Sequence, residues 1–288
     1  MTTMRGLDGN TAAALLRRWA VEALERHSRE DTLPTSLRHL FYEAVMAGVV
    51  AKGDSTRQTR GRRPDQNLTD AVTWLREHGY VPWSVIEDRT RHLTDHRGDG
   101  DTIRDGVDEV LDNIRVDPWG DVLPILVAES ESAAGVLVRT AFDRRTVIVP
   151  TRGQSNGWLR TFVHDQIDRP VAVGYVGDAD KAGGDIEANT HRVLDEVLDI
   201  KEWERIALTW KQVETHGLPT VPRTDGRNQL TYEVCEVEAL PQRILVTLAV
   251  DFLDGWLPDG VAWHDVHERE KGQRDEIRQL LNPLEAPA

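Results

Sequence analysis

One segment constrains the fold of this chain more than any other: residues 171–190, VAVGYVGDAD followed by KAGGDIEANT. An apolar strand runs directly into Asp178 and Asp180, and a glycine pair and an amphipathic helix follow. Two carboxylates two positions apart, on a turn after a strand, both face the crevice at the carboxyl edge of an open parallel sheet, where such sheets bind ligands. The segment therefore predicts an α/β fold with a site at this edge.

A second apolar strand, residues 122–128 (VLPILVA), also ends on a carboxylate, Glu129. Carboxylate oxygens are hard ligands that suit Mg²⁺ better than zinc or copper. Glu129, Asp178 and Asp180 at the ends of neighbouring strands therefore predict a divalent-metal site of the kind used in phosphoryl transfer.

Other roles for these acids stay open. Asp178 and Asp180 are also the residue type that caps a turn and a following helix. Glu131 competes with Glu129 for the same role, although its position indicates the start of a helix. Asp185 is a further candidate ligand, but an acid in a first helical turn is also favoured by the helix dipole.

Strands and helices alternate through the second part of the chain, which predicts a parallel sheet with right-handed crossovers. The strands are expected at residues 122–129, 146–151, 170–177 and 205–210, and the helices at residues 131–142, 155–167, 183–199 and 236–256.

The first part of the chain is predicted to be helical. Apolar residues recur at helical spacing in residues 11–28, 37–47 and 64–78, and residues 80–85 (YVPWSV) are typical of extended chain. Three helices and a short strand pair indicate a winged helix-turn-helix, a nucleic-acid-binding unit.

The chain is thus expected to divide into four parts. They are a winged-helix DNA-binding domain (1–97), a connector (98–121), a parallel-sheet domain with a C-terminal extension (122–260), and a charged, partly disordered tail (261–288).

The net charge of −14 is unevenly distributed. Residues 1–97 carry 15 Lys and Arg against 13 Asp and Glu, whereas residues 98–288 carry 20 against 36. Arginines cluster in a loop of the first part, which suits contact with phosphates, although a solvated loop without a partner explains the same charges. The candidate DNA-binding residues are Arg57, Arg60, Arg62 and Arg63 in this loop, with Arg76, Arg89 and Arg91 after it.

Composition excludes several classes of protein. The longest apolar runs are far shorter than the roughly 20 residues that cross a bilayer, and the N-terminus has no signal-peptide pattern. A single cysteine, Cys235, forms no internal disulfide and is expected to be buried. We therefore expect a cytoplasmic protein without a membrane partner.

These motifs together carry a family resemblance. Glu129, the DAD of residues 178–180 and Gly183 resemble the toprim domain of topoisomerases, primases and nucleases. Residues 36–45 (SLRHLFYEAV) resemble the Arg-x-x-Tyr-Tyr helix of the topoisomerase VI A subunit and the meiotic double-strand-break protein, and residues 237–241 (VEALP) resemble a later segment of that family. The resemblance covers residues 10–255 and is greatest to the minimal Mini-A versions of phages and plasmids.

The resemblance implies a type IIB topoisomerase-like enzyme that cleaves duplex DNA with Mg²⁺ or Mn²⁺. Tyr42 would attack DNA and form a 5′-phosphotyrosyl link, with Phe41 in place of the family's first tyrosine. Arg38, four residues earlier on the same helix face, would stabilise the phenolate or the phosphate. The enzyme would be a homodimer in which tyrosine and metal come from opposite subunits.

The chain departs from the family in two respects. Lys181 stands where the family often has proline, and no GxxxxGK[ST] motif is present, so strand passage with ATP would need a separate ATPase subunit. Two alternatives remain: a toprim nuclease that hydrolyses DNA with metal and water, and a non-catalytic DNA-binding or partner-binding module. A primase is disfavoured because no zinc-binding module precedes the toprim-like part.

Overall fold

The centre of the molecule is a four-stranded sheet in the order β2-β1-β3-β4, with every pairing parallel. The computed structural model describes residue 7 and residues 9–50, 64–87, 102–151, 159–163, 167–224 and 230–281. The strands are β1 (Leu123–Ala128), β2 (Ile148–Pro150), β3 (Val171–Val176) and β4 (Ile200–Ala207). The predicted α/β class with a parallel sheet is thus confirmed.

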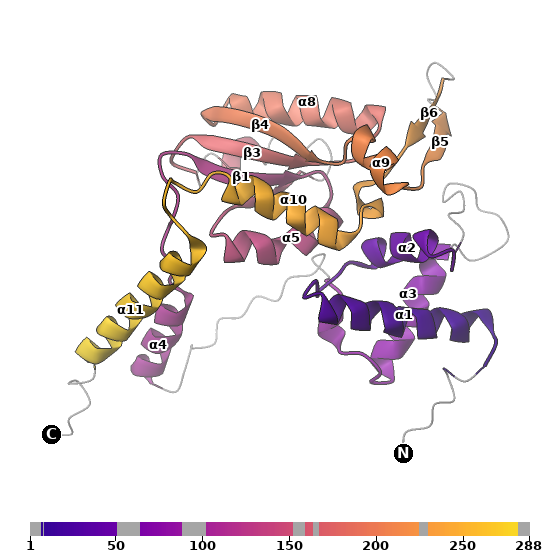
Figure 1. The fold of residues 1–288 in the computed structure, drawn as a ribbon, viewed down its shortest axis with the longest axis horizontal. Helices are drawn as coiled ribbons and strands as arrows, with labels where there is room; N and C mark the ends of the chain where they lie inside the picture. The colour runs from indigo at the N-terminus through magenta and orange to yellow at the C-terminus, as the bar shows by residue number, and fades with distance from the viewer. Residues whose placement is uncertain are drawn as a thin grey trace.

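Helices cover both faces of the sheet, as Figure 1 shows. Helix α8 (Lys181–Asp195) lies on one face, and α5 (Glu131–Asp143) and α10 (Gln242–Asp254) lie on the other. The central strands β1 and β3 are buried along their whole length, because each has a strand on either side and helices above and below. This explains why both strands are continuous apolar runs in the sequence.

The fourth strand was predicted too late in the chain, at residues 205–210 instead of Ile200–Ala207. β4 is the edge strand next to β3, and Lys201, Glu202 and Glu204 are exposed on it. Charged side chains protect a sheet edge from pairing with other chains. They also interrupt the apolar pattern, so the sequence does not show the start of this strand.

Several elements after β4 were not predicted. Helix α9 (Trp210–His216) follows the strand, and β5 (Val221–Thr224) and β6 (Thr231–Val234) form an antiparallel hairpin. The predicted helix over residues 236–256 is a short 3₁₀ turn, η3 (Val237–Ala239), followed by α10. Of the helix predicted over residues 155–167, the described part is a π-helical turn, η2 (Leu159–Val163).

The first part of the chain contains three helices, α1 (Ala12–Arg29), α2 (Leu37–Met46) and α3 (Pro64–Glu77). They share a hydrophobic cluster that includes Leu24, Leu40 and Leu68. The predicted extended segment at residues 80–85 instead contains a 3₁₀ turn, η1 (Trp83–Val85), and Ile86 forms an isolated parallel bridge with Thr35. Residues 88–100, where a second wing strand would follow, lie outside the described part.

Residues 263–281 were expected to belong to a charged tail, but they form a long helix, α11 (Trp263–Leu281). In Figure 1 this helix runs beside α4 (Ile103–Asn113), and the pair extends away from the sheet. Glu270 anchors α11, because its carboxylate binds the Arg145 guanidinium in two places, at 3.0 and 2.8 Å.

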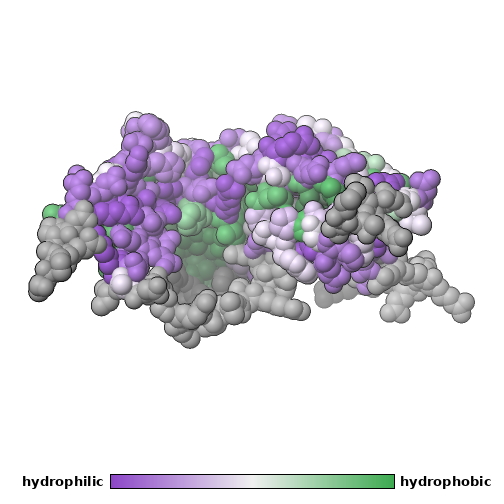
Figure 2. Space-filling model, turned by 90° about the horizontal axis from the view of Figure 1, so that it is seen from below, coloured by the Kyte–Doolittle hydropathy of each residue, from purple (hydrophilic) through white to green (hydrophobic). Residues whose placement is uncertain are grey.

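Seen from below, most of the surface is hydrophilic, and a hydrophobic area lies in a recess over α5 (Figure 2). In the described part of the chain, no helix combines the length and apolar character that crossing a membrane requires.

Candidate functional site

The carboxyl ends of β1 and β3 bring two of the predicted acidic residues together. The two strands are adjacent and in register from Leu123↔Val171 to Ala128↔Val176. Glu129 directly follows β1, and its Oε2 accepts a hydrogen bond of 3.1 Å from the backbone N–H of Asp178. A Cβ on Gly177 would lie 2.8 Å from this oxygen, so a glycine is needed for the contact.

Asp180 lies on the same turn and caps helix α8. Its Oδ1 accepts the N–H of Gly183, and its side chain is almost fully buried. The turn is tight, because a Cβ on Gly183 would lie 2.4 Å from the carbonyl oxygen of Asp178. The capping role that the sequence left open for Asp180 is therefore present in the structure, and Asp180 Oδ2 lies 3.8 Å from Arg223 Nη1.

An arginine that was not predicted as a site residue, Arg205, holds this turn in place. Arg205 on β4 donates from Nη1 to the carbonyl oxygens of Asp178 at 3.1 Å and Leu208 at 2.8 Å. Its Nε binds Glu187 Oε2 at 2.7 Å. The Arg205 guanidinium thus connects three elements: the turn that contains Asp178, the edge strand β4 and helix α8.

A second pair of acids, Glu236 and Glu238, lies beside the turn. Backbone hydrogen bonds of 2.9 and 3.2 Å pair Cys235 with Ala179, between the two predicted aspartates. Two residues further on, the N–H of Val237 donates to Asp178 Oδ1 at 2.9 Å. The segment after β6 is therefore held against the carboxyl edge of the sheet.

Glu238 is 2% exposed, and the Ser130 hydroxyl donates to its Oε1 at 2.9 Å. Its Oε2 accepts no hydrogen bond from the described residues and lies 3.5 Å from Arg38 Nε. Glu238 is not among the predicted site residues, although the E-x-E spacing of residues 236–238 repeats the D-x-D spacing of residues 178–180. That repeat is the signal that would have found both glutamates.

Helix α2 brings the predicted tyrosine to these glutamates. Ser36 caps the helix by accepting the N–H of His39, and its hydroxyl also binds the Ser132 hydroxyl at the start of α5, at 2.7 Å. Tyr42 is 3% exposed, and its hydroxyl donates a hydrogen bond to Glu236 Oε2. Arg38, one turn earlier, places Nη2 at 2.8 Å from the same oxygen.

The site holds more negative than positive charge, and its pKa values reflect this. Burial, together with Glu238 and Glu129, raises the pKa of Asp178 to about 7. Burial also raises the pKa of Glu129, and the nearby Asp180 adds to the effect. Burial opposes the charge on Arg38, but the carboxylates of Glu238 and Glu236 outweigh it and raise the pKa of the guanidinium.

The tyrosine hydroxyl is held in its neutral form. Burial raises the pKa of Tyr42 above its usual range, and the negative charge of Glu236 adds to the rise. A neutral phenol is a weak nucleophile, so attack by Tyr42 needs a group that removes its proton.

In this structure the predicted metal ligands are not arranged as a coordination shell. Among the described residues, no group of three or more His, Cys, Asp or Glu side chains is arranged to hold a metal ion. Glu129, Asp178 and Asp180 each bind one backbone N–H through one carboxylate oxygen. The two alternative metal ligands considered from the sequence lie in helices. Glu131 is in the first turn of α5, and Asp185 is exposed on α8.

Most of the predicted DNA-binding arginines fall on residues that the structure does not describe. These are Arg57, Arg60, Arg62, Arg63, Arg89 and Arg91. Arg76 is described, and its guanidinium lies over the Trp83 ring, 4.3 Å from the centroid, and donates to the Trp83 carbonyl at 2.6 Å. These two contacts hold η1 against α3.

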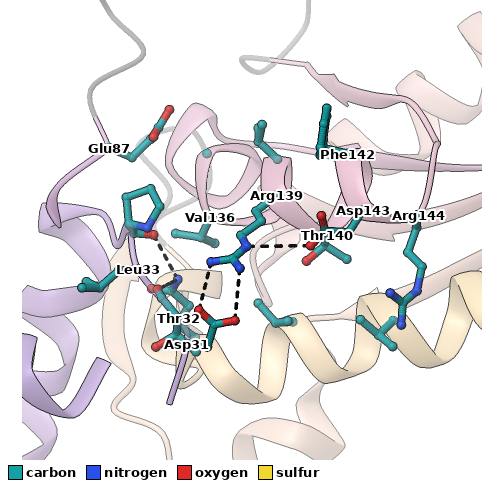
Figure 3. A pocket seen from close by; sticks show the side chains of 16 residues that line it. Asp31, Thr32, Leu33, Glu87, Val136, Arg139, Thr140, Phe142, Asp143 and Arg144 are labelled. Carbon is teal, nitrogen blue, oxygen red and sulfur yellow. Dashed lines mark hydrogen bonds and ion pairs between the residues drawn. The ribbon is translucent and has the colours of Figure 1, made fainter. Parts of the chain in front are cut away.

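A pocket of about 410 Å³ lies apart from the acidic site, between the loop before α2 and the helices α5 and α10. Figure 3 shows Arg139 of α5 reaching across it to Asp31, with two contacts of 3.0 and 3.2 Å. Gln242 of α10 donates to the Thr32 carbonyl at 2.6 Å. None of the predicted site residues is among those that line this pocket, so its contacts join the helical part to the sheet.

Comparison of the chain with protein-family models, with curated proteins and with solved structures finds no match.

Proposed function

We propose that this chain is a DNA-cleaving enzyme in which Tyr42 attacks a backbone phosphate and becomes joined to the 5′ end of the broken strand. One observation carries the proposal: the Tyr42 hydroxyl is bound to Glu236, whose neighbour Val237 is bound to Asp178 at the carboxyl edge of the sheet. A nucleophile from the helical part and acids from the sheet thus meet in one chain.

The finer fold assignment belongs to the same proposal. A toprim domain is supported by the all-parallel sheet, with Glu129 and Asp178 following the adjacent strands β1 and β3. A winged helix is supported by the three packed helices α1, α2 and α3. The arrangement agrees with the resemblance to the topoisomerase VI A subunit and its Mini-A relatives.

The acidic residues suit a divalent cation. Their oxygens are hard donors. Burial, with added repulsion from neighbouring carboxylates, raises the pKa values of Asp178 and Glu129, so a positive charge there would stabilise their ionised forms. Glu129, Asp178 and Asp180 are the residues that would hold Mg²⁺ or Mn²⁺ after small side-chain movements. When bound, the ion would neutralise charge on the phosphate and on the leaving oxygen.

The chain's own residues account for the remaining chemistry. The Tyr42 oxygen forms a bond to phosphorus, and the bond from phosphorus to the 3′ oxygen breaks. Arg38, 47% exposed at the edge of the site, is placed to bind the phosphate as a charged hydrogen-bond donor. The phosphotyrosine conserves the energy of the phosphodiester, so resealing requires no ATP.

Duplex DNA is the proposed substrate, and a homodimer would make two staggered breaks. The resemblance implies that tyrosine and metal come from opposite subunits, whereas here Tyr42 contacts the acidic segment of its own chain. Strand passage would need a separate ATPase subunit.

A second candidate is a hydrolytic nuclease, because Tyr42 is only 3% exposed in this structure. A buried tyrosine must move before it reaches DNA, whereas a metal-bound water would not depend on it. In this case the acids alone would cut DNA.

Cleavage of supercoiled plasmid with Mg²⁺ or Mn²⁺, stopped with SDS and run with and without protease, separates the two candidates. We expect protein-linked nicked or linear DNA from the wild type and from the control Tyr232→Phe, and none from Tyr42→Phe or Asp178→Asn. Protein-free cuts that persist in Tyr42→Phe would overturn the tyrosine mechanism and establish the nuclease.

A further inference from the structure

Glu236 occupies a fixed position beside the reactive tyrosine. It follows Cys235, whose backbone pairs with Ala179, and it precedes Val237, whose N–H binds Asp178. Both neighbours are therefore tied to the carboxyl edge of the sheet. The side chain of Glu236 is 28% exposed, so it lies at the boundary between the buried acids and the surface.

The contacts of Glu236 form a chain of three groups. Oε2 accepts the hydrogen of the Tyr42 hydroxyl, and Arg38 Nη2 lies 2.8 Å from the same oxygen. A nucleophile bound to a base, with the base oriented by a third group, is the arrangement that activates hydroxyl nucleophiles in many enzymes. Here Tyr42 is the nucleophile and Arg38 is the orienting group.

We propose that Glu236 is the general base that accepts the proton of Tyr42 during attack on the phosphate. The inference rests on the function proposed above. As the Tyr42 oxygen bonds to phosphorus, its proton passes to Glu236 Oε2, and the departing 3′ oxygen takes a proton from solvent. In the resealing direction the 3′ hydroxyl loses its proton to solvent as its oxygen bonds to phosphorus, and Glu236 returns its proton to the departing tyrosine oxygen, so that protons and charges balance.

Neighbouring acids are less suited to this role. Glu238 is 2% exposed and accepts the Ser130 hydroxyl, and Asp178 accepts the N–H of Val237. The hydrogen bond of Tyr42 goes to Glu236.

The test measures the rate of covalent adduct formation with enzyme in excess over a labelled duplex, from pH 5.5 to 9.5. The variants are Glu236→Gln, which keeps the shape and an acceptor oxygen, Glu236→Asp, which keeps the carboxylate, and Glu233→Gln, an exposed control on β6. The groups that face Glu236 are Tyr42 and Arg38 from α2, Glu238 from η3 and Asp178 from the turn after β3. These four groups are unchanged in the variants.

We expect Glu236→Gln to slow adduct formation by roughly 10²- to 10⁴-fold, the usual contribution of a general base, with DNA affinity in EDTA changed less than about threefold. Its rate should rise about tenfold per pH unit, because hydroxide must replace the base, whereas the wild-type rate levels off. Glu236→Asp should be faster than Glu236→Gln, and Glu233→Gln should match the wild type.

Two results would overturn the inference alone: a Glu236→Gln rate equal to or above that of the wild type, or a slow rate with the wild-type pH profile. An equal rate would leave Glu236 without a catalytic role, and a higher rate would make it a barrier to the phosphate. A slow rate with the wild-type pH profile would make its role structural. Absence of any adduct from the wild type would instead overturn the proposed function, and the inference with it.

Discussion

At the scale of single residues, two adjacent glycines at the start of α8 have opposite environments. A Cβ on Gly183 would meet the Asp178 carbonyl oxygen at 2.4 Å, whereas a Cβ on Gly184 would meet nothing within 4 Å. The glycine pair in the sequence therefore contains one position that the turn requires and one that it does not.

Gly183→Ala should lower the free energy of unfolding by about 1–3 kcal/mol, because the turn must shift to admit the methyl group. Gly184→Ala is the matched control and should be neutral or up to about 1 kcal/mol more stable, since alanine favours a helix. Urea unfolding of both variants measures the difference. Equal stabilities would show that the turn is not as tight as the structure indicates.

The raised pKa of Asp178 predicts a pH dependence of stability. A carboxyl whose pKa is about 7 in the folded protein, against 3.8 for an ordinary aspartate, stabilises the fold fully below about pH 4. That contribution is lost as the pH rises through about 7, because deprotonation leaves a buried negative charge close to Glu238 and Glu129.

Asp178→Asn removes this titration. In EDTA, the variant should gain stability relative to the wild type between pH 5 and pH 8, on the order of 1–3 kcal/mol. Thermal or urea unfolding at both pH values measures the gain. A difference between the two proteins that does not change with pH would contradict the assignment of Asp178 as a buried, repelled carboxyl.

At the scale of elements, the sequence was most informative where an element is buried on all sides. β1 and β3 are continuous apolar runs, and their predicted bounds lie within one or two residues of those observed. β4 was misplaced, and α9 and the β5–β6 hairpin were missed, because they are short or carry exposed charged residues. Local pattern does not reveal such elements, since their pairing with distant segments defines them.

Local sequence pattern also predicts only part of the site. Glu129, Asp178 and Asp180 were chosen because each follows an apolar strand, which is a local signal. Glu236 and Arg205 enter the site through tertiary contacts, with Tyr42 and with the turn after β3. Those contacts depend on how α2 and β4 pack, which the local pattern does not specify.

Helix α11 also depends on a tertiary contact, the buried pair of Glu270 with Arg145. Glu270→Ala leaves the Arg145 charge buried and without this partner, which should destabilise the protein by about 3–5 kcal/mol. Glu276→Ala, at an exposed position of the same helix, should change stability by less than about 0.5 kcal/mol. Similar effects of both variants in urea unfolding would contradict a docked α11.

At the scale of the whole molecule, the proposed DNA binding must overcome a net charge of −14. The proposed contacts are concentrated in the predicted arginine loop of residues 57–63, whereas residues 98–288 carry an excess of acids. Binding should therefore be strongly salt-dependent, and the loop should account for much of that dependence.

Replacing the four loop arginines with glutamine should reduce the slope of log K against log salt by up to about 0.9 per lost phosphate contact. The control is Arg139→Gln, because the Arg139 guanidinium is paired with the Asp31 carboxylate. Titration of a labelled duplex in EDTA at several salt concentrations measures the slope. An unchanged slope would exclude the loop from the DNA interface.

The measurement that tests the central claim most directly is mass spectrometry of the protein after reaction with DNA and Mg²⁺, followed by nuclease and trypsin. Trypsin should release residues 39–52 as one peptide, in which Tyr42 is the only tyrosine. We predict a nucleotide joined through phosphate to Tyr42 in this peptide. Cut DNA with the peptide unmodified, or a nucleotide on a different residue, would contradict the proposed mechanism.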